Sequence, residues 1–438
     1  MTGMRRAIVV GIVSAVVATN VPAQQPAVVP QAPLQITLQE AVRRALDVQP
    51  AMIQARGVQR NAGASSRSAW GAFLPTVTTN ASASRSNTST FRSGTTDTLP
   101  PTYSYSGGLS ASLVLFDGFA RFANVASSSA TLDAAGAGLV NQRYQVTAAT
   151  AQVFFTALAD EELVRVAQAQ VDRAKEELQI AVNKFQAGAA TRSDTLTATV
   201  DLGTARLGLL QAQANLATAQ ANLGRQVGVD QLVRAVPDSA FPPLPDTTTL
   251  RASALSSAPL VRQADAQASA ARAQVWSTRS LYWPSVTLSY SNTRAGVGSP
   301  LLPLFNGYPE SFTWRFGLSW TLFNGFSREQ SQVSASVARD NAEAQAADAR
   351  RQVNALYTQQ LAATSTAWAQ IQIAGADIVA ATEAARVQQE RYRLGAGTLL
   401  DLLTAQANLT QAAVSQVQAR YNYLIARAQL EAIVGHTL

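Results

Sequence analysis

The side chains that carry out most protein chemistry are scarce in this sequence of 438 residues. It contains no cysteine and a single histidine, His436, close to the end of the sequence. Cysteine nucleophiles, Cys/His zinc sites and histidine bases therefore lack candidates. No group of carboxylates, hydroxyls and imidazoles stands out either. We expect no enzymatic activity, no metal and no cofactor, with His436 exposed to solvent.

Two aspartates do suggest a function. Asp194 and Asp401 each lie six residues after a glycine, Gly188 or Gly395, in segments that are otherwise short of charge. In a symmetric oligomer, one carboxylate from each copy can form a ring around a narrow central passage, and such a ring attracts cations. Glycine after a helix is also the usual residue at which the chain reverses. We therefore expect two helical hairpin turns, with Asp401 in an electrostatic constriction.

Both aspartates belong to a sequence that occurs twice. The block KFQAGAATRSDTL at 184–196 matches RYRLGAGTLLDLL at 391–403, a spacing of 207 residues. The motif LFDGF at 115–119 recurs as LFNGF at 322–326 with the same spacing. Each half is expected to contain a helix, two strands, a long helix, a glycine turn and a final helix. The repeated LF[DN]GF motif marks the exit from the strands into the long helix.

Proline placement predicts very long helices. No proline falls between Pro101 and Pro237, and none follows Pro309. Both stretches are rich in Ala, Gln, Leu, Arg and Glu, which favour helix. A helix over 121–185 would be about 95 Å long, more than a compact domain can hold. Apolar residues within 151–185 recur at steps of three and four, which predicts packing against other helices.

Four segments alternate between apolar and polar residues, as strands with one lipid-exposed face do. They span 75–84, 103–115, 284–291 and 312–322, the last reading FTWRFGLSWTL. The aromatic residues expected to contact lipid are Phe312, Trp314, Phe316, Trp320, Tyr103, Tyr105 and Tyr290. Four strands cannot close a membrane β-barrel. We expect a homotrimer, because twelve strands enclose a lumen whereas eight enclose a filled interior.

The N-terminal residues resemble a secretory signal. Arg5 and Arg6 precede a twelve-residue apolar run, and Val21-Pro22-Ala23 fits a cleavage site. We interpret 1–23 as a signal peptide that is removed, and find no other stretch apolar enough for a transmembrane helix. The expected organisation of the remaining chain is an extended segment at 24–37, a first repeat at 38–235, a proline-rich linker at 236–249 and a second repeat at 250–436.

The signal peptide, the duplication, the LF[DN]G junctions and the paired glycine turns together resemble the outer membrane factor (TolC-like) family. The resemblance implies a trimer with a twelve-stranded barrel in the outer membrane of a Gram-negative-type bacterium, continued by an α-helical barrel across the periplasm. The implied function is the passive exit duct of a tripartite efflux pump or type I secretion system. The implied partners are a periplasmic adaptor (membrane fusion) protein and an inner-membrane pump or ABC exporter.

The resemblance also implies roles for residues at the helical tip. The periplasmic gate would contain Asp401, Thr404, Asp194 and Tyr392. The tip turns that contact the adaptor would contain Gly188, Ala189, Thr191, Gly395, Ala396, Gly397 and Thr398. This chain has Thr404 where the family has a second acidic residue, and Gly397 where an arginine is frequent. A weaker acidic ring and fewer gate-locking ion pairs are implied.

Two other functions fit parts of the pattern. A periplasmic coiled-coil adaptor also has long helical hairpins, but should lack four membrane-type strands and an end-to-end duplication. A secreted trimeric coiled-coil structural protein should show sustained heptads and no twin glycine turns.

The formal net charge of +7 includes Arg5 and Arg6. The other arginines are dispersed along helices, so we expect no nucleic-acid partner.

Overall fold

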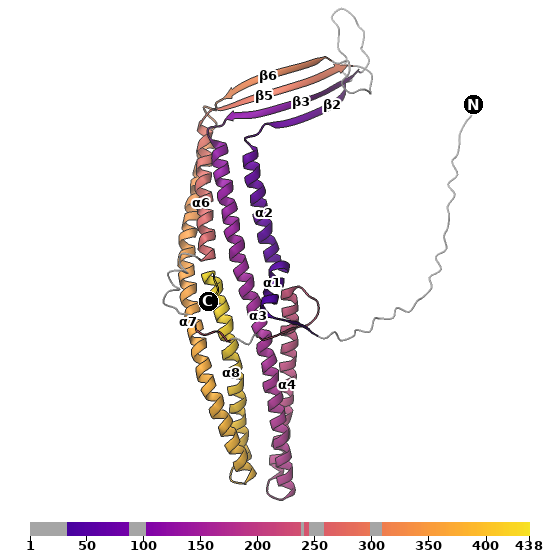
Figure 1. Ribbon diagram of the computed structural model, residues 1–438, viewed down its shortest axis with the longest axis vertical. Helices are drawn as coiled ribbons and strands as arrows, with labels where there is room; N and C mark the ends of the chain where they lie inside the picture. Colours follow the sequence, from indigo (N-terminus) through magenta and orange to yellow (C-terminus); the bar gives the residue numbers. More distant parts are fainter. Residues whose placement is uncertain (1–32, 87–101, 238–240, 245–257, 298–308) are drawn as a thin grey trace, which may run out of the picture.

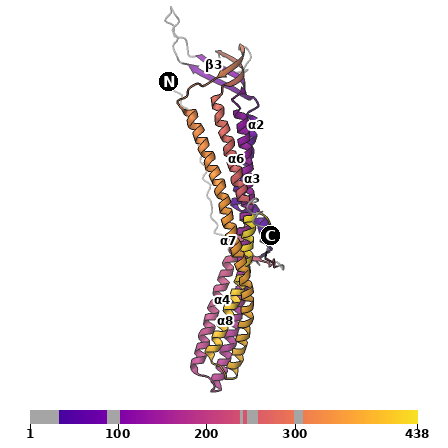
Figure 2. The ribbon, with the colours of Figure 1, turned by 90° about the vertical axis from the view of Figure 1, so that its left-hand side faces the viewer.

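A computed structural model describes residues 33–86, 102–237, 241–244, 258–297 and 309–438. The predicted signal peptide at 1–23 and residues 24–32 of the extended segment lie outside these ranges. The molecule is elongated, with a sheet at one end and two helical hairpin turns at the other (Figures 1 and 2). None of the described helices is long and apolar enough to cross a membrane.

The helices reproduce the duplication residue for residue. The long helices α3 (Ala120–Gln186) and α7 (Ser327–Arg393) each contain 67 residues, which makes each about 100 Å long. The helices that follow the glycine turns, α4 (Arg192–Val227) and α8 (Leu399–Val434), each contain 36 residues. The prediction of two proline-free helices, each joined to a shorter one through a glycine turn, is confirmed.

Shorter helices precede the strands of each half. They are α1 (Leu38–Val48), α2 (Pro50–Gly71), α6 (Pro259–Arg279) and the 3-10 turn η1 (Ser280–Tyr282). Pro50 and Pro259 open α2 and α6, where a missing N–H costs no hydrogen bond. Thr37 caps α1 by accepting from the backbone N–H of Glu40.

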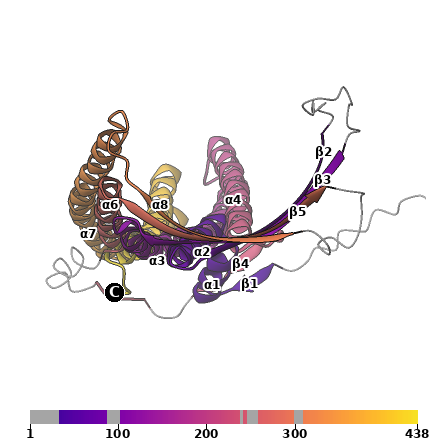
Figure 3. The same ribbon diagram turned by 90° about the horizontal axis from the view of Figure 1, so that it is seen from above.

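The helices lie side by side in one curved layer, seen end-on in Figure 3. Small residues fill the contacts between them, as where Ala264 and Ala268 of α6 meet Ala346 and Ala349 of α7. Because alanine adds little bulk, neighbouring helix axes can approach closely. Buried apolar clusters form between neighbouring helices, as around Phe154 and Leu223, while many apolar side chains elsewhere in the layer stay exposed.

Four antiparallel strands form the sheet, in the order β2-β3-β5-β6. Their bounds are β2 (Thr76–Ser86), β3 (Thr102–Phe116), β5 (Ser285–Val297) and β6 (Glu310–Ser319). Hydroxyl pairs join β2 to β3 on one face, for example Thr78 to Ser110 at 2.7 Å between the side-chain oxygens. The outer edges of β2 and β6 have no partner strand among the described residues.

The other face of the sheet is apolar and aromatic. Tyr290 lies opposite Trp314, with ring centroids 4.7 Å apart. Phe312, Trp314 and Phe316 are each about two-thirds exposed. Such exposure of large apolar side chains is rare on a protein surface that faces water. Lipid contact by these residues therefore stays a prediction, supported by their shared face.

Two details depart from the expected strands. The strand predicted at 312–322 ends at Ser319, so Trp320 lies beyond it and its Nε1 donates to the Tyr282 carbonyl oxygen at 3.2 Å. A bulge between Val114 and Phe116 places Phe116 opposite Val286. Leu115 therefore falls outside the alternation of apolar and polar residues that the sequence predicts for 103–115. Bulges of this kind bend a strand, here where it leaves the sheet.

A second, smaller sheet lies at the middle of the molecule. The strand β1 (Leu34–Ile36) runs parallel to β4 (Val233–Ala235). It ties the extended N-terminal segment to the end of the first repeat, a pairing that the sequence analysis did not predict. The described part of the linker, residues 236–237 and 241–244, has no regular structure.

The two LF[DN]GF junctions adopt the same conformation, as predicted. Gly118 and Phe119 have φ of 67° and 68°, and Gly325 and Phe326 both have φ of 64°. Two successive left-handed residues turn the chain sharply from strand to helix. In the first junction, an oxygen of Asp117 accepts from the Arg121 backbone N–H at 3.1 Å, which satisfies one free donor of α3.

Replacing Gly118 should destabilise the fold more than replacing a helical glycine. A Cβ at Gly118 would lie 2.6 Å from both the Ser280 carbonyl oxygen and the Trp283 Cβ, at a φ of +67°. We expect Gly118→Ala to lower the free energy of unfolding by on the order of 1–3 kcal/mol. The measurement is denaturant unfolding followed by helical circular dichroism.

The matched control is Gly63→Ala in α2, where a Cβ would meet Leu132 at an ordinary 3.9 Å. We expect this variant to gain about 0.5–1 kcal/mol, the usual advantage of alanine within a helix. Equal effects of the two substitutions would contradict the role given to Gly118.

Candidate functional site

The candidate site is the helical tip, where the α3–α4 and α7–α8 turns lie together at the end remote from the sheet (Figure 1). Gly188 and Gly395 have φ of 72° and 77°, the left-handed conformation that the sequence predicted. In the first turn, Ala189 N–H donates to the Lys184 carbonyl at 2.8 Å. Ala396 donates in the same way to Arg391 at 2.8 Å. These bonds close the C-terminus of each long helix.

Both predicted aspartates cap the helices that leave the turns. Asp194 Oδ2 accepts from the Thr191 backbone N–H at 2.9 Å, while Thr191 Oγ1 accepts from the Asp194 N–H at 3.2 Å. Asp401 Oδ2 accepts from the Thr398 N–H at 3.2 Å and from its hydroxyl at 2.8 Å. This capping role was not predicted from the sequence, although threonine three residues before an acidic residue is the signature of a capping box.

The Asp401 carboxylate carries a negative charge that is exposed and can attract cations in a passage. Its side chain is exposed, and both hydrogen bonds from Thr398 go to the same oxygen, Oδ2. The hydrogen bonds from Thr398 and then the positive charge of Arg391 hold the pKa of Asp401 below its usual value. The carboxylate is therefore ionised at neutral pH.

Asp401 and Thr404 line one groove between α7 and α8, with a volume of about 680 Å³. Thr404 uses its hydroxyl to donate to the Leu400 carbonyl at 2.8 Å within the helix. At position 397, a Cβ would lie 3.2 Å from the Arg391 Cβ. The close approach of Arg391 gives a physical reason for glycine where an arginine was expected.

Tyr392 does not line that groove and faces Ile180 of α3 instead. It is 4% exposed and packs against Leu399 and Leu402. Lys184 of α3 donates to the Tyr392 carbonyl oxygen, and its Nζ lies 4.1 Å from the centre of the Tyr392 ring. Burial, then the negative charge of Asp194, raises the pKa of Tyr392. The structure thus brings Tyr392 and Asp194 within electrostatic reach, while Asp401 lies in the α7–α8 groove.

A buried carboxylate near the tip was missed by the sequence analysis. Glu177 of α3 is 1% exposed, and neither of its oxygens has a hydrogen-bond partner among the described residues. Burial, then the charge of Asp201 on α4, raises its pKa to about 8, against the opposing effect of Arg173. A signal existed, because position 177 lies in line with the buried residues Ala174 and Ala181 of the same helix.

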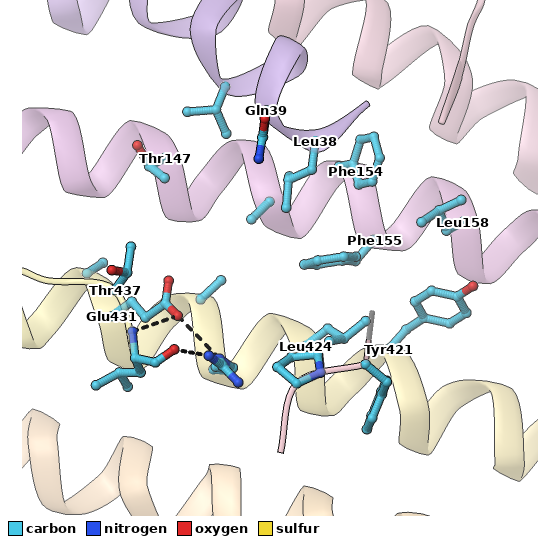
Figure 4. Close-up of a pocket in the computed structure, with 18 of the residues that line it drawn as sticks. Leu38, Gln39, Thr147, Phe154, Phe155, Leu158, Tyr421, Leu424, Glu431 and Thr437 are labelled. Atoms are coloured by element: carbon cyan, nitrogen blue, oxygen red, sulfur yellow. Dashed lines mark hydrogen bonds and ion pairs between the residues drawn. The ribbon is translucent and has the colours of Figure 1, made fainter. Parts of the chain in front are cut away.

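The middle of the molecule contains a cavity of about 510 Å³ that the sequence did not predict. Figure 4 shows Leu38, Phe154, Phe155 and Leu424 lining it, from α1, α3 and α8. These side chains make it largely apolar, with Glu431 at one end. It lies where the two repeats and the linker meet, remote from the tip.

The buried Glu177 carboxyl should make stability depend on pH. Because its pKa is raised from 4.5 to about 8, the folded state binds the proton more tightly than the unfolded state. The free energy of unfolding should therefore fall as pH rises from about 4.5 to 8. Glu177→Gln should remove this contribution and stabilise the protein above pH 8. Denaturant unfolding at pH 5, 7 and 9 measures the effect.

Glu176→Gln is the matched control, because Glu176 is exposed and accepts from Gln389 at 3.1 Å. Because the negative charge of Glu176 is the smallest of the influences on the pKa of Glu177, this variant should keep most of the wild-type pH dependence. If Glu177→Gln also followed the wild-type curve, Glu177 would not be the group that titrates.

Comparison with solved structures shows which proteins share this architecture. VceC of Vibrio cholerae is 18% identical, with 91% of this chain and 96% of that chain covered and a TM-score of 0.76. The CmeC outer membrane channel of Campylobacter jejuni is 20% identical, with 91% and 85% covered and a TM-score of 0.78. The open MtrE outer membrane channel of Neisseria gonorrhoeae is 21% identical, with 91% and 89% covered and a TM-score of 0.73.

A search of curated protein sequences finds no match. The family model for outer membrane efflux proteins matches residues 41–229 and 250–436, one match in each half of the duplication. These matches cover most of the chain. The chain therefore belongs to the outer membrane efflux protein family, the non-enzymatic outer-membrane channels of tripartite efflux systems, which form trimers and extend into the periplasm.

Proposed function

We propose that three copies of this chain join head to tail into one tube, which is the passive exit duct of an efflux pump. The four strands of each copy then close a sheet of twelve. One observation carries this proposal: the two surfaces through which the repeats contact each other inside the chain have equivalents at its two outer flanks.

Inside the chain, α3 of the first repeat packs against α6 of the second. Ser277 Oγ donates to Asn124 Oδ1 at 2.7 Å, and Asn141 donates to Gln263 at 3.2 Å. Gly118 lies against the η1 turn at Ser280. Side chains of small and polar residues thus join the two repeats.

The duplication relates α3 to α7 by 207 residues and α6 to α2 by 209, since Pro259 corresponds to Pro50. Ser331 on α7 then corresponds to Asn124, and Ser68 on α2 corresponds to Ser277. Within one chain these two surfaces lie on different flanks. A Cβ at Gly325, the counterpart of Gly118, would meet nothing within 4 Å.

Exposed apolar side chains gather on the same two flanks. On α7 and its start they are Phe326, Val333 and Val337; on α2 and its end they are Ile53, Val58, Trp70 and Leu74. A head-to-tail contact between α7 of one copy and α2 of the next would cover the parts of both sets that face the neighbouring helix. Phe326 and Leu74 would stay partly exposed, because their counterparts inside the chain, Phe119 and Trp283, are each 60% exposed. Such contacts form a ring when the rotation between copies closes, as it does for three copies at 120°.

The tip supports a regulated entrance. Three Asp401 carboxylates would surround the lumen at one level, where they attract cations. Leu394 and Leu400 are 82% and 73% exposed beside the glycine turn. Exposed leucines at the end of a hairpin suit a partner that buries apolar surface. We propose that a periplasmic adaptor contacts these tip turns and links the channel to an inner-membrane pump or exporter, which supplies the energy.

Cysteine cross-linking tests the head-to-tail contact, and the chain has no cysteine of its own. We expect the double variant Ser68→Cys, Ser331→Cys to form disulfide-linked dimers and trimers in outer membranes, because the equivalent internal pair is in hydrogen-bond contact. Denaturing gels without reductant measure this. Ser68→Cys paired with Thr358→Cys, farther along α7, should stay monomeric on the same gels. Equal cross-linking of both pairs would argue against the specific contact.

The charge of Asp401 should determine ion selectivity at the tip. Asp401→Asn keeps a side chain that can cap the helix but removes the charge, so the reconstituted channel should lose much of its cation preference and its block by periplasmic divalent cations. Reversal potentials in planar bilayers measure the preference. Asp194→Asn, on the other hairpin, should change it less. An unaltered reversal potential for Asp401→Asn would leave Asp401 as a helix cap alone.

A further inference from the structure

One charged side chain interrupts the polar face of the sheet. Along the described strands, the face opposite Trp314 consists of serine, threonine, glycine and other uncharged residues, apart from Arg315. Arg315 lies opposite Ser289, while its neighbour Trp314 lies opposite Tyr290 on the apolar face. Because side chains alternate along a strand, the guanidinium projects from the polar face.

Arg315 has no counter-ion among the described residues. Its side chain is exposed, and its backbone carbonyl accepts from Ser289 Oγ at 3.4 Å. Arg294 differs, because it lies on the opposite face and pairs with Glu310 at 2.8 Å. The charge of Arg315 is therefore available to mobile ions.

Assembly would leave this charge unpaired. β6 is an edge strand, so in a closed sheet it meets β2 of the next copy. The sequence of β2, TVTTNASASRS, contains no carboxylate. The residues facing Arg315 across that contact would be hydroxyl and amide side chains, which solvate a guanidinium but do not neutralise it.

We propose that Arg315 forms a ring of three guanidinium groups inside the sheet-enclosed part of the passage, and that this ring attracts small anions and the anionic groups of transported molecules. This inference rests on the proposed trimeric channel. Phosphate and carboxylate groups are the anions that arginine binds best. The ring lies at the opposite end of the molecule from Asp401, so the passage carries charges of opposite sign at its two ends (Figure 1).

The dimensions allow the ring to act across the passage. Twelve strands about 4.8 Å apart and tilted by about 40° give a closed sheet about 24 Å in diameter. The arginine side chain reaches inward from that wall. Its charge therefore lies within about 10 Å of the axis, which is about the Debye length at 0.1 M salt. At 1 M salt the Debye length falls to about 3 Å. The effect on ions should be strong at low salt and weak at high salt.

The test is the reversal potential of purified channels in planar bilayers under a potassium chloride gradient. Arg315→Gln should raise the potassium-to-chloride permeability ratio about twofold to threefold near 0.05 M salt, with little change near 1 M, where the charge is screened. Arg315→Lys should keep the wild-type ratio. If Arg315→Gln leaves the ratio unchanged at low salt, the ring has no influence and the inference is overturned.

Cysteine chemistry supplies a second measurement, again without background from native cysteines. A cationic thiosulfonate on Arg315→Cys should restore the wild-type ratio, and an anionic one should shift it further towards potassium. Thr313→Cys, on the same face, should react with these water-soluble reagents, whereas Phe316→Cys, on the apolar face, should not. If Thr313→Cys reacts but Arg315→Cys does not, position 315 does not face the passage. That result would overturn the inference about Arg315 without contradicting the proposed channel. Failure of the wild type to form channels would instead overturn the proposed function.

Discussion

The unpaired backbone at the two edges of the sheet is the constraint on which the rest of this structure depends. β2 and β6 each present a row of N–H and C=O groups with no partner strand among the described residues. In hydrocarbon, each unsatisfied group costs several kcal/mol. The face that carries Trp314 and Phe316 is too apolar to be stable in water. The sheet is therefore complete only when its edges pair with other copies of the chain.

The duplication turns this requirement into a repeating contact. Because α3 and α7 are the same length and follow equivalent junctions, the surface that joins the two repeats is built once inside the chain and once at its flanks. Alanine-rich contacts between helices suit this arrangement, since they let a single layer curve without a bulky core. The cost is a monomer with exposed apolar flanks, which favours assembly over the isolated chain.

Much of the fold was predictable because it depends on local patterns that recur. The proline-free stretches, the alternating strands and the glycine turns each follow from residue type, and the structure has all of them. The bulge at Leu115 was not predictable, because alternation alone cannot locate an inserted residue. The pairing of β1 with β4 was also missed, since three-residue parallel strands far apart in sequence leave no periodic signal.

The site was predictable in part, for a similar reason. Glycine and aspartate at equal spacing indicated the turns, but Asp194 and Asp401 also cap helices, a role visible from Thr191 and Thr398. The burial of Glu177 depends on the packing of α3 against other helices, which sequence spacing shows only weakly. The family assignment and the four-stranded sheet exclude the coiled-coil adaptor and the secreted coiled-coil protein as functions of this chain.

Cryo-electron microscopy of the protein extracted from outer membranes tests the central claim most directly. The account predicts three copies around one axis, with β6 of each copy hydrogen-bonded antiparallel to β2 of the next and α7 packed against the neighbouring α2. A monomer, an even number of copies, or a ring in which those edges remain unpaired would contradict it.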